Sequence, residues 1–171
     1  TANVAGAYLH AEMKDFTLFK MEGESVDIMC DVCEKYREFV CYQNRKKVLY
    51  LKLLKALYGC VQSALLLYEL FTGTLKGIGF ELNQYGMCVP NKTIDNKQCT
   101  IVWYVDDTKI SHKNGNVVSY VIDKIESKFG KMTVTLGKEH VFLGMNINFH
   151  KNGTASIKMK EYIKEAIADF G

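Results

Sequence analysis

Two adjacent carboxylates, Asp106 and Asp107, directly follow the apolar and aromatic run "IVWYV" of residues 101–105. Neighbouring carboxylates repel each other, and burying either of them without a partner costs free energy. At the tip of a hairpin such a pair is suited to hold Mg²⁺, which prefers oxygen ligands and keeps waters that a phosphate can replace. Two such ions clamp the attacking and leaving oxygens of a phosphoryl transfer. The alternative is an ordinary solvated turn.

The rest of the composition indicates one globular domain. The chain has 171 residues, of which 48% are hydrophobic and 24% charged, enough to bury a core. We find no uncharged apolar run long enough to span a bilayer, and we expect no membrane partner. The net charge of +3 is too small to indicate a nucleic-acid partner. The basic segment "NRKKVLYLKLLK" is either a surface that faces phosphates or a solvated strand face.

Hydrophobic periodicity predicts the elements that must position the carboxylates. Helical spacing indicates helices at 61–76, 116–129 and 160–170, with Asn116 as the N-cap of the second. The inward-facing residues expected in the third helix are Tyr162, Ile163, Ala166, Ile167 and Phe170. Residues 9–46 are predicted to form hairpins and loops. Strands are predicted at 1–8, 47–54, 99–105 (fully buried), 108–112, 140–149 and 155–159.

These elements predict an α+β fold. When residues 9–54 are set aside, the order is strand, helix, strand, turn, strand, helix, strand. This order is typical of the split βαβ (ferredoxin-like) arrangement, an antiparallel sheet backed by two helices. There the first strand lies beside the hairpin strands, so the turn at Asp106 and Asp107 is expected close to residues 3–8. The fold alone does not determine a function.

Four segments give the chain a specific resemblance. "YVDD" (104–107) resembles the catalytic turn of reverse transcriptases. "LLKALYGCVQSALLLYELF" (53–71) resembles the "LxKALYGLKQAPRxWY" segment of copia-type retrotransposon enzymes. "NVAGAYLHAEM" (3–13) resembles their first catalytic motif, and "FGKMTVTLGKEHVFLGMNI" (129–147) resembles the segment that leads into the primer-gripping hairpin. The chain is thereby similar to a palm-centred fragment of a copia-type LTR retrotransposon reverse transcriptase.

The resemblance implies a polymerase palm at 1–8 and 55–150, a partial fingers insertion at 9–54, and the start of the palm–thumb connection at 151–171. It implies RNA-directed DNA synthesis with two Mg²⁺ or Mn²⁺ ions, an RNA template, a DNA or RNA primer and dNTP. The implied context is a Gag-Pol polyprotein inside the cell, in the cytoplasm and, for active elements, in virus-like particles. The absence of an initiator Met and the position of the motifs indicate a piece of a longer protein with incomplete fingers and thumb.

The resemblance also assigns roles to individual residues. Asp106 is the main metal ligand and Asp107 its companion. Tyr8 lies under the incoming sugar, although a core aromatic is the alternative. Lys138 is a candidate proton donor to pyrophosphate, or an ordinary surface lysine. The helix that packs on the nucleotide and template begins with Tyr58, Gly59 and Gln62, and the primer grip comprises Phe142, Leu143, Gly144 and Met145.

The chain departs from the family pattern at one decisive position. Asn3 stands where the family has the Asp that bridges the two ions, and an amide is neutral, with a single carbonyl oxygen. We expect a rate lowered by several orders of magnitude, because the metals supply most of the charge stabilisation. Val61 and Leu67 also replace the usual Lys and Trp.

Two other functional interpretations stay open. A non-catalytic RNA-binding module of split βαβ fold predicts exposed aromatics on its strands, whereas Trp103 and Tyr104 lie in a run that is expected to be buried. A degenerate remnant without a function is the third possibility.

Overall fold

The computed structural model describes residues 1–170 and divides into two compact units, each described by itself below. The first unit comprises Thr1–Ala7 and the chain from Leu67 onward, and the second comprises Tyr8–Leu66. Gly171, the last residue of the predicted connection at 151–171, lies outside the described residues. The predicted mixture of helices and antiparallel sheets is confirmed.

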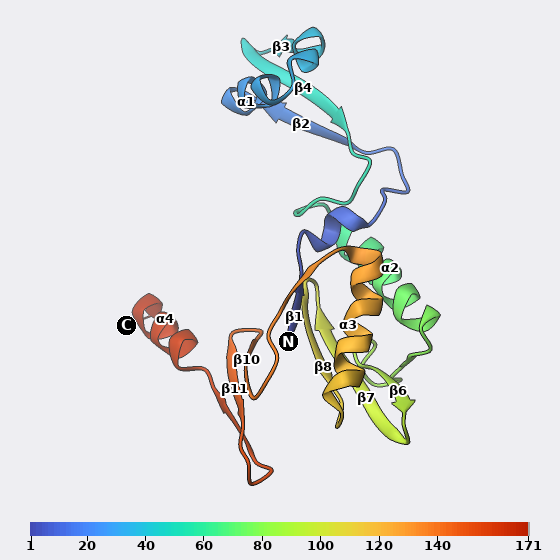
Figure 1. Ribbon diagram of the computed structural model, residues 1–171. Helices are drawn as coiled ribbons and strands as arrows, with labels where there is room; N and C mark the ends of the chain where they lie inside the picture. The colour runs from blue at the N-terminus through green and yellow to red at the C-terminus, as the bar shows by residue number, and fades with distance from the viewer. Residues whose placement is uncertain (171) are drawn as a thin grey trace. The chain divides into compact units, whose positions relative to one another are not determined.

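The first unit contains a six-stranded sheet. Its strand order is β5-β6-β7-β8-β1-β9, and every pair of neighbours is antiparallel. The first strand therefore lies beside the β7–β8 hairpin, at the place where the sequence analysis expected it (Figure 1). The strands are β1 (Ala2–Val4), β5 (Glu81–Leu82), β6 (Pro90–Ile94), β7 (Lys97–Tyr104), β8 (Asp107–Ser111) and β9 (Met132–Val134).

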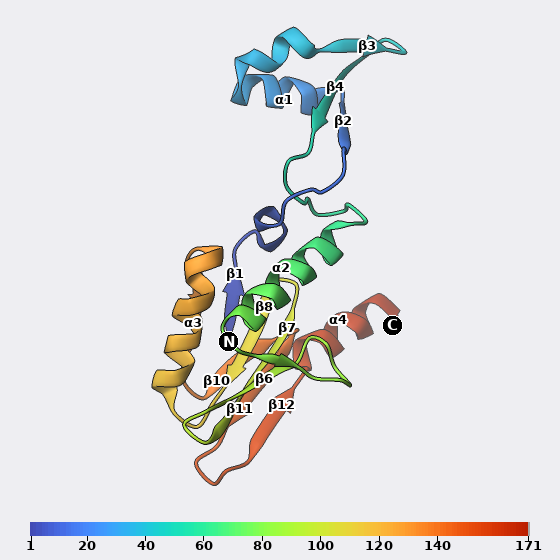
Figure 2. The same cartoon turned by 90° about the vertical axis from the view of Figure 1, so that its right-hand side faces the viewer.

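Helices α2 (Ser63–Gly77) and α3 (Gly115–Phe129) share one core with this sheet, and both lie beside β7 and β8 in Figures 1 and 2. The Phe71 ring of α2 lies 4.6 Å from that of Trp103 on β7 and 5.3 Å from that of Phe129 on α3. Such tilted ring pairs add to the free energy of burial.

The N-cap of α3 is Asn114, whose side chain accepts from the Asn116 N–H. The predicted cap at Asn116 is wrong, because Asn114 is the extended residue before the first turn.

Strand β7 is buried on one face only. Ile101 and Trp103 are buried, whereas Val102 is half-buried and Tyr104 is 63% exposed. The prediction of a fully buried strand over 99–105 is therefore wrong. An antiparallel sheet can keep one face free of helices, and alternate residues of its strands then point away from the core.

A second, three-stranded sheet with the order β10-β11-β12 follows in the first unit. The predicted single strand at 140–149 is two strands, because Leu143 and Gly144 both have positive φ and form a tight turn. The prediction that the apolar side chains of the final helix, residues 160–170, face inward is wrong, because Ile167 is 65% exposed and Phe170 is 92% exposed. These elements are β10 (Glu139–Phe142), β11 (Met145–Phe149), β12 (Ala155–Lys158) and α4 (Lys160–Phe170).

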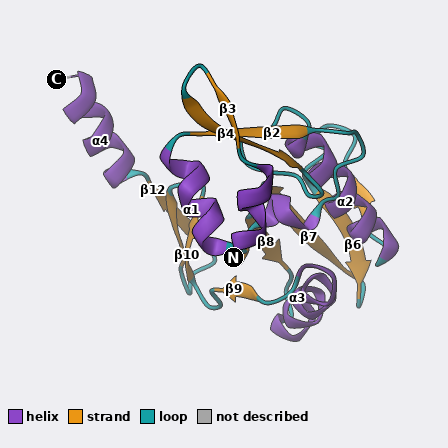
Figure 3. Ribbon diagram, turned by 90° about the horizontal axis from the view of Figure 1, so that it is seen from above, coloured by secondary structure: helices purple, strands orange, loops and turns teal. Residues whose placement is uncertain are grey.

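The second unit is a three-stranded antiparallel sheet, β2-β4-β3, packed on a helix (Figure 3). Its core comprises Val26 and Cys30 of the helix and Leu49 of the central strand. The prediction of hairpins and loops over 9–46 is wrong at this helix. The elements are η1 (Ala7–His10, shared with the first unit), β2 (Leu18–Glu22), α1 (Glu24–Val32), η2 (Glu34–Phe39), β3 (Cys41–Gln43) and β4 (Lys46–Lys52).

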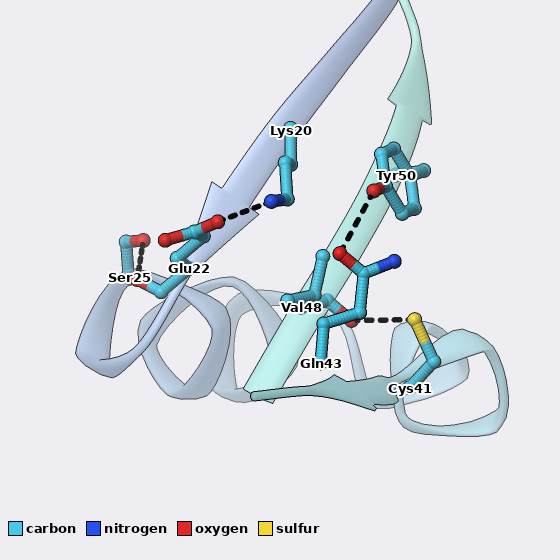
Figure 4. Close-up of polar contacts among 7 residues, drawn as sticks. All are labelled: Lys20, Glu22, Ser25, Cys41, Gln43, Val48 and Tyr50. Carbon is cyan, nitrogen blue, oxygen red and sulfur yellow. Dashed lines mark hydrogen bonds and ion pairs between the residues drawn. The ribbon is translucent and has the colours of Figure 1, made fainter. Parts of the chain in front are cut away.

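Polar contacts along this small sheet join its exposed side chains (Figure 4). Lys20 pairs with Glu22 on β2, and the Tyr50 hydroxyl of β4 donates to Gln43 of β3 at 3.2 Å. The Ser25 hydroxyl donates to the Glu22 carbonyl at 2.8 Å, which ties the start of α1 to the end of β2. In the described part of the chain, no helix is long and apolar enough to cross a membrane.

Candidate metal centre

The β7–β8 hairpin presents the two carboxylates at its tip. Tyr104 pairs with Asp107, so the connection is the two-residue turn Val105–Asp106. Val105 has φ 54, a conformation that a β-branched residue rarely adopts. The Asp106 carbonyl accepts from the Val4 N–H at 2.9 Å. The turn is thereby tied to β1, and strain at Val105 accompanies this fixed geometry.

Asn3 faces both carboxylates from β1. Its backbone pairs with that of Asp107. Its side-chain amide nitrogen lies 3.2 Å from Asp106 Oδ2 and 3.4 Å from Asp107 Oδ1, and donates to both. All three residues are partly exposed. The structure therefore brings together the three residues that the sequence analysis placed at one site, in a position that solvent reaches.

The donor set fits one divalent ion better than two. Two carboxylates, with waters and a phosphate, are a usual environment for one Mg²⁺. Within residues 1–170, no group of three or more His, Cys, Asp or Glu side chains could hold a metal. Asp106 and Asp107 therefore have no third carboxylate beside them in this part of the chain. The uncharged Asn3 amide also donates to oxygens of both carboxylates and so competes with a cation for them.

The predicted nucleotide-binding residues lie in the second unit. The rings of Tyr8 and Tyr58 meet edge to face at 4.5 Å. Gly59 has φ 89, and a Cβ placed there would meet nothing within 4 Å, so backbone conformation rather than close approach explains the glycine. The Gln62 amide donates to Asp15 at 3.0 Å. The prediction that residues 58–62 begin a helix is wrong, because α2 starts at Ser63.

The predicted primer grip forms the tip of the β10–β11 hairpin. Phe142 is buried and pairs with Met145 across the turn of Leu143 and Gly144. Lys138 is exposed just before β10, and its carbonyl accepts from the Phe149 N–H at 2.9 Å.

Sequence reasoning missed Lys109, two residues after Asp107 on β8. Its Nζ donates to Ser111 Oγ at 2.8 Å and lies 5.5 Å from the centre of the Phe149 ring. Burial lowers the pKa of Lys109 below its usual value. The available signal was the spacing, because residues two apart on a strand, such as Asp107 and Lys109, lie on the same side of it.

The chain thus combines helices and antiparallel sheets with an acidic hairpin tip beside the first strand. A family model, "Reverse transcriptase (RNA-dependent DNA polymerase)", matches residues 2–171, and the chain belongs to this family.

A curated protein, the "Putative transposon Ty5-1 protein" of Saccharomyces cerevisiae, is 27% identical to the chain over 113 residues, which are 66% of this chain and 36% of that protein. The chain thus matches about a third of that relative's length. Both matches support the copia-type reverse transcriptase fragment that the sequence resemblance predicted. No solved structure matches the chain.

Proposed function

We propose that this chain is the palm-centred part of a copia-type retrotransposon reverse transcriptase whose ancestral reaction is RNA-directed DNA polymerisation. In this proposal residues 1–8 and 55–150 are the palm, 9–54 a part of the fingers, and 151–171 the start of the connection to the thumb. The partners are an RNA template, a DNA or RNA primer, dNTP and the remainder of a Gag-Pol polyprotein. The location is intracellular, in the cytoplasm and in virus-like particles.

The contact of the Asn3 amide with both carboxylates carries the proposal. Asp106 and Asp107 would hold a divalent ion, which when bound polarises phosphate oxygens and stabilises the charge of the transition state. Asn3 supplies hydrogen-bond donors at the point where the family supplies a third carboxylate. The two aspartates of this chain therefore support one ion poorly and two ions not at all, and we infer that polymerisation is nearly abolished.

The remaining roles follow from the family resemblance. Tyr8 and Tyr58, which contact each other, shape the nucleotide site together with Gly59 and Gln62. The tip of the β10–β11 hairpin positions the primer end. Lys138, exposed at the start of that hairpin, is the candidate proton donor.

Primer extension on an RNA template tests the proposal. The chain is fused at both ends to the corresponding segments of an active copia-type reverse transcriptase and assayed with Mg²⁺ or Mn²⁺. We expect Asn3→Asp to raise the extension rate by several orders of magnitude, because it restores the bridging carboxylate. Asn3→Asp combined with Asp106→Asn is the matched control and returns the rate to background. Equal extension by the native fusion and its Asn3→Asp variant refutes the proposed role of position 3.

An RNA-binding module without chemistry is the second candidate. Tyr104, 63% exposed beside the carboxylates, favours it, because an exposed strand aromatic can stack on a base. Trp103 does not favour it, because this residue is buried. The basic segment does not favour it either, because Lys47 pairs with Asp27 and Lys55 with Glu12. Filter binding of single-stranded RNA separates the two candidates. Affinity that changes neither on removing Mg²⁺ nor in Asp106→Ala favours the module.

A further inference from the structure

A cavity of about 570 Å³ lies in the first unit at the end of β8 remote from the acidic turn. Its walls come from Thr1, β8, the first turns of α3, the segment after β9, and the β10–β11 hairpin. Lys109, Ser111 and Ser119 give it polar atoms, and Val118, Leu136 and Phe149 give it apolar surface. The cavity is large enough for a small organic molecule.

Lys109 is the charged side chain of this cavity that lacks a carboxylate partner. Its hydrogen bond goes to the neutral Ser111 hydroxyl, and its second contact is the Phe149 ring. No Asp or Glu lines the cavity in the described part of the chain. The two histidines of the wall are already engaged by backbone groups. His112 contacts the Ile94 carbonyl and the Asn114 N–H, and His140 contacts the Gly137 carbonyl and the amino group of Thr1.

Lys109 is partly buried and its contacts are a neutral hydroxyl and an aromatic ring, so its charge is poorly compensated in the free protein. An anionic group beside Nζ compensates that charge through a charge-assisted hydrogen bond. A metal ion is disfavoured, because the wall supplies a positive charge and no carboxylate. The charge of the cavity therefore selects an anion.

The apolar wall adds a second requirement. Phe149 lies against the Lys109 ammonium, and Val118 and Leu136 line the same space. Inorganic phosphate leaves that surface in contact with water, whereas a ligand with a flat apolar body covers it.

We propose that this cavity binds a small organic anion, a phosphate or carboxylate attached to an aromatic or heteroaromatic ring, with the anion at Lys109 and the ring against Phe149. This site requires no metal and is independent of the proposed polymerase chemistry. It involves neither Asn3 nor the acidic turn.

Calorimetric titration of the chain in EDTA tests the proposal, with phenyl phosphate, benzoate, inorganic phosphate and a short single-stranded RNA as probes. We expect saturable binding of phenyl phosphate, one molecule per chain, and weaker binding of inorganic phosphate. Lys109→Met keeps roughly the length of the side chain but removes its charge. We expect it to raise the dissociation constant for phenyl phosphate by at least about tenfold.

Lys113→Met is the matched control, because Lys113 is exposed on the neighbouring turn and does not line the cavity. It leaves the affinity unchanged, and circular dichroism verifies that both variants fold. The proposal is overturned by equal affinity in the Lys109→Met protein, by no saturable binding of phenyl phosphate or benzoate, or by Lys109-dependent binding of the RNA alone.

Discussion

Replacing Asn3 with Asp should destabilise the metal-free protein. The change removes the two hydrogen bonds that the amide donates to Asp106 and Asp107 at 3.2 and 3.4 Å. Bonds to charged groups contribute about 1.5–3 kcal/mol each, and we take about 1 kcal/mol for these long, half-exposed ones. A third carboxylate at this distance adds repulsion of about 1 kcal/mol in a water-like medium. The expected loss is about 2–4 kcal/mol of unfolding free energy.

Urea denaturation in EDTA, followed by circular dichroism, measures this loss. Asn3→Ala is the matched control: it removes the same hydrogen bonds without adding charge, so it should lie between the native protein and Asn3→Asp. Adding Mn²⁺ should offset most of this loss, because a ligand of the folded state at about one hundred times its dissociation constant adds about 2.7 kcal/mol. The reasoning fails if Asn3→Asp is as stable as the native chain in EDTA, or if Mn²⁺ stabilises both proteins equally.

Three further predictions concern the elements that hold the site. Val105→Gly should raise the urea midpoint, by about 1 kcal/mol of stability, because glycine relieves the strain of a positive φ; a lower midpoint would contradict this. Phe71→Ala should cost about 3–5 kcal/mol in the same assay, whereas Phe170→Ala, at a 92% exposed position, should cost less than about 0.5 kcal/mol. The Lys131 ammonium and the Met132 N–H lower the pKa of Glu126. Its contribution to stability is therefore present above the usual glutamate pKa of 4.5 and is lost as the pH falls further. Glu126→Gln should be less stable than the native chain at neutral pH and equally stable in strong acid; a gap independent of pH would refute the assignment.

The meeting of Asn3 with the acidic pair could be predicted because two short-range signals agreed. An apolar run that ends in two carboxylates predicts a hairpin tip, and the element order places the first strand beside that hairpin. The register Asn3↔Asp107 then brings the side chains together. Local pattern and chain topology were sufficient for this part of the site.

Other features depend on tertiary structure that a one-dimensional pattern does not carry. Tyr104 is exposed because the helices cover one face of the sheet, which burial along the strand alone cannot distinguish. The turn at Leu143 was missed because leucine rarely adopts a positive φ. The helix containing Val26 and Cys30 was missed because its charged residues obscured a short apolar face.

The placement of Lys109 in a cavity also required the three-dimensional structure. The strands and loop that surround it come from distant parts of the chain, so its lack of a carboxylate partner could not be inferred from neighbours in sequence.

We propose that the Asn3 amide occupies the position of a bridging metal-binding carboxylate. Electron paramagnetic resonance of free Mn²⁺, titrated against the native chain and the Asn3→Asp variant, tests it most directly. We predict at most one weakly bound Mn²⁺ per native chain and two, bound more tightly, per Asn3→Asp chain, with both sites lost when Asp106 is also replaced by Asn. Identical binding curves for the native and Asn3→Asp proteins would contradict the account.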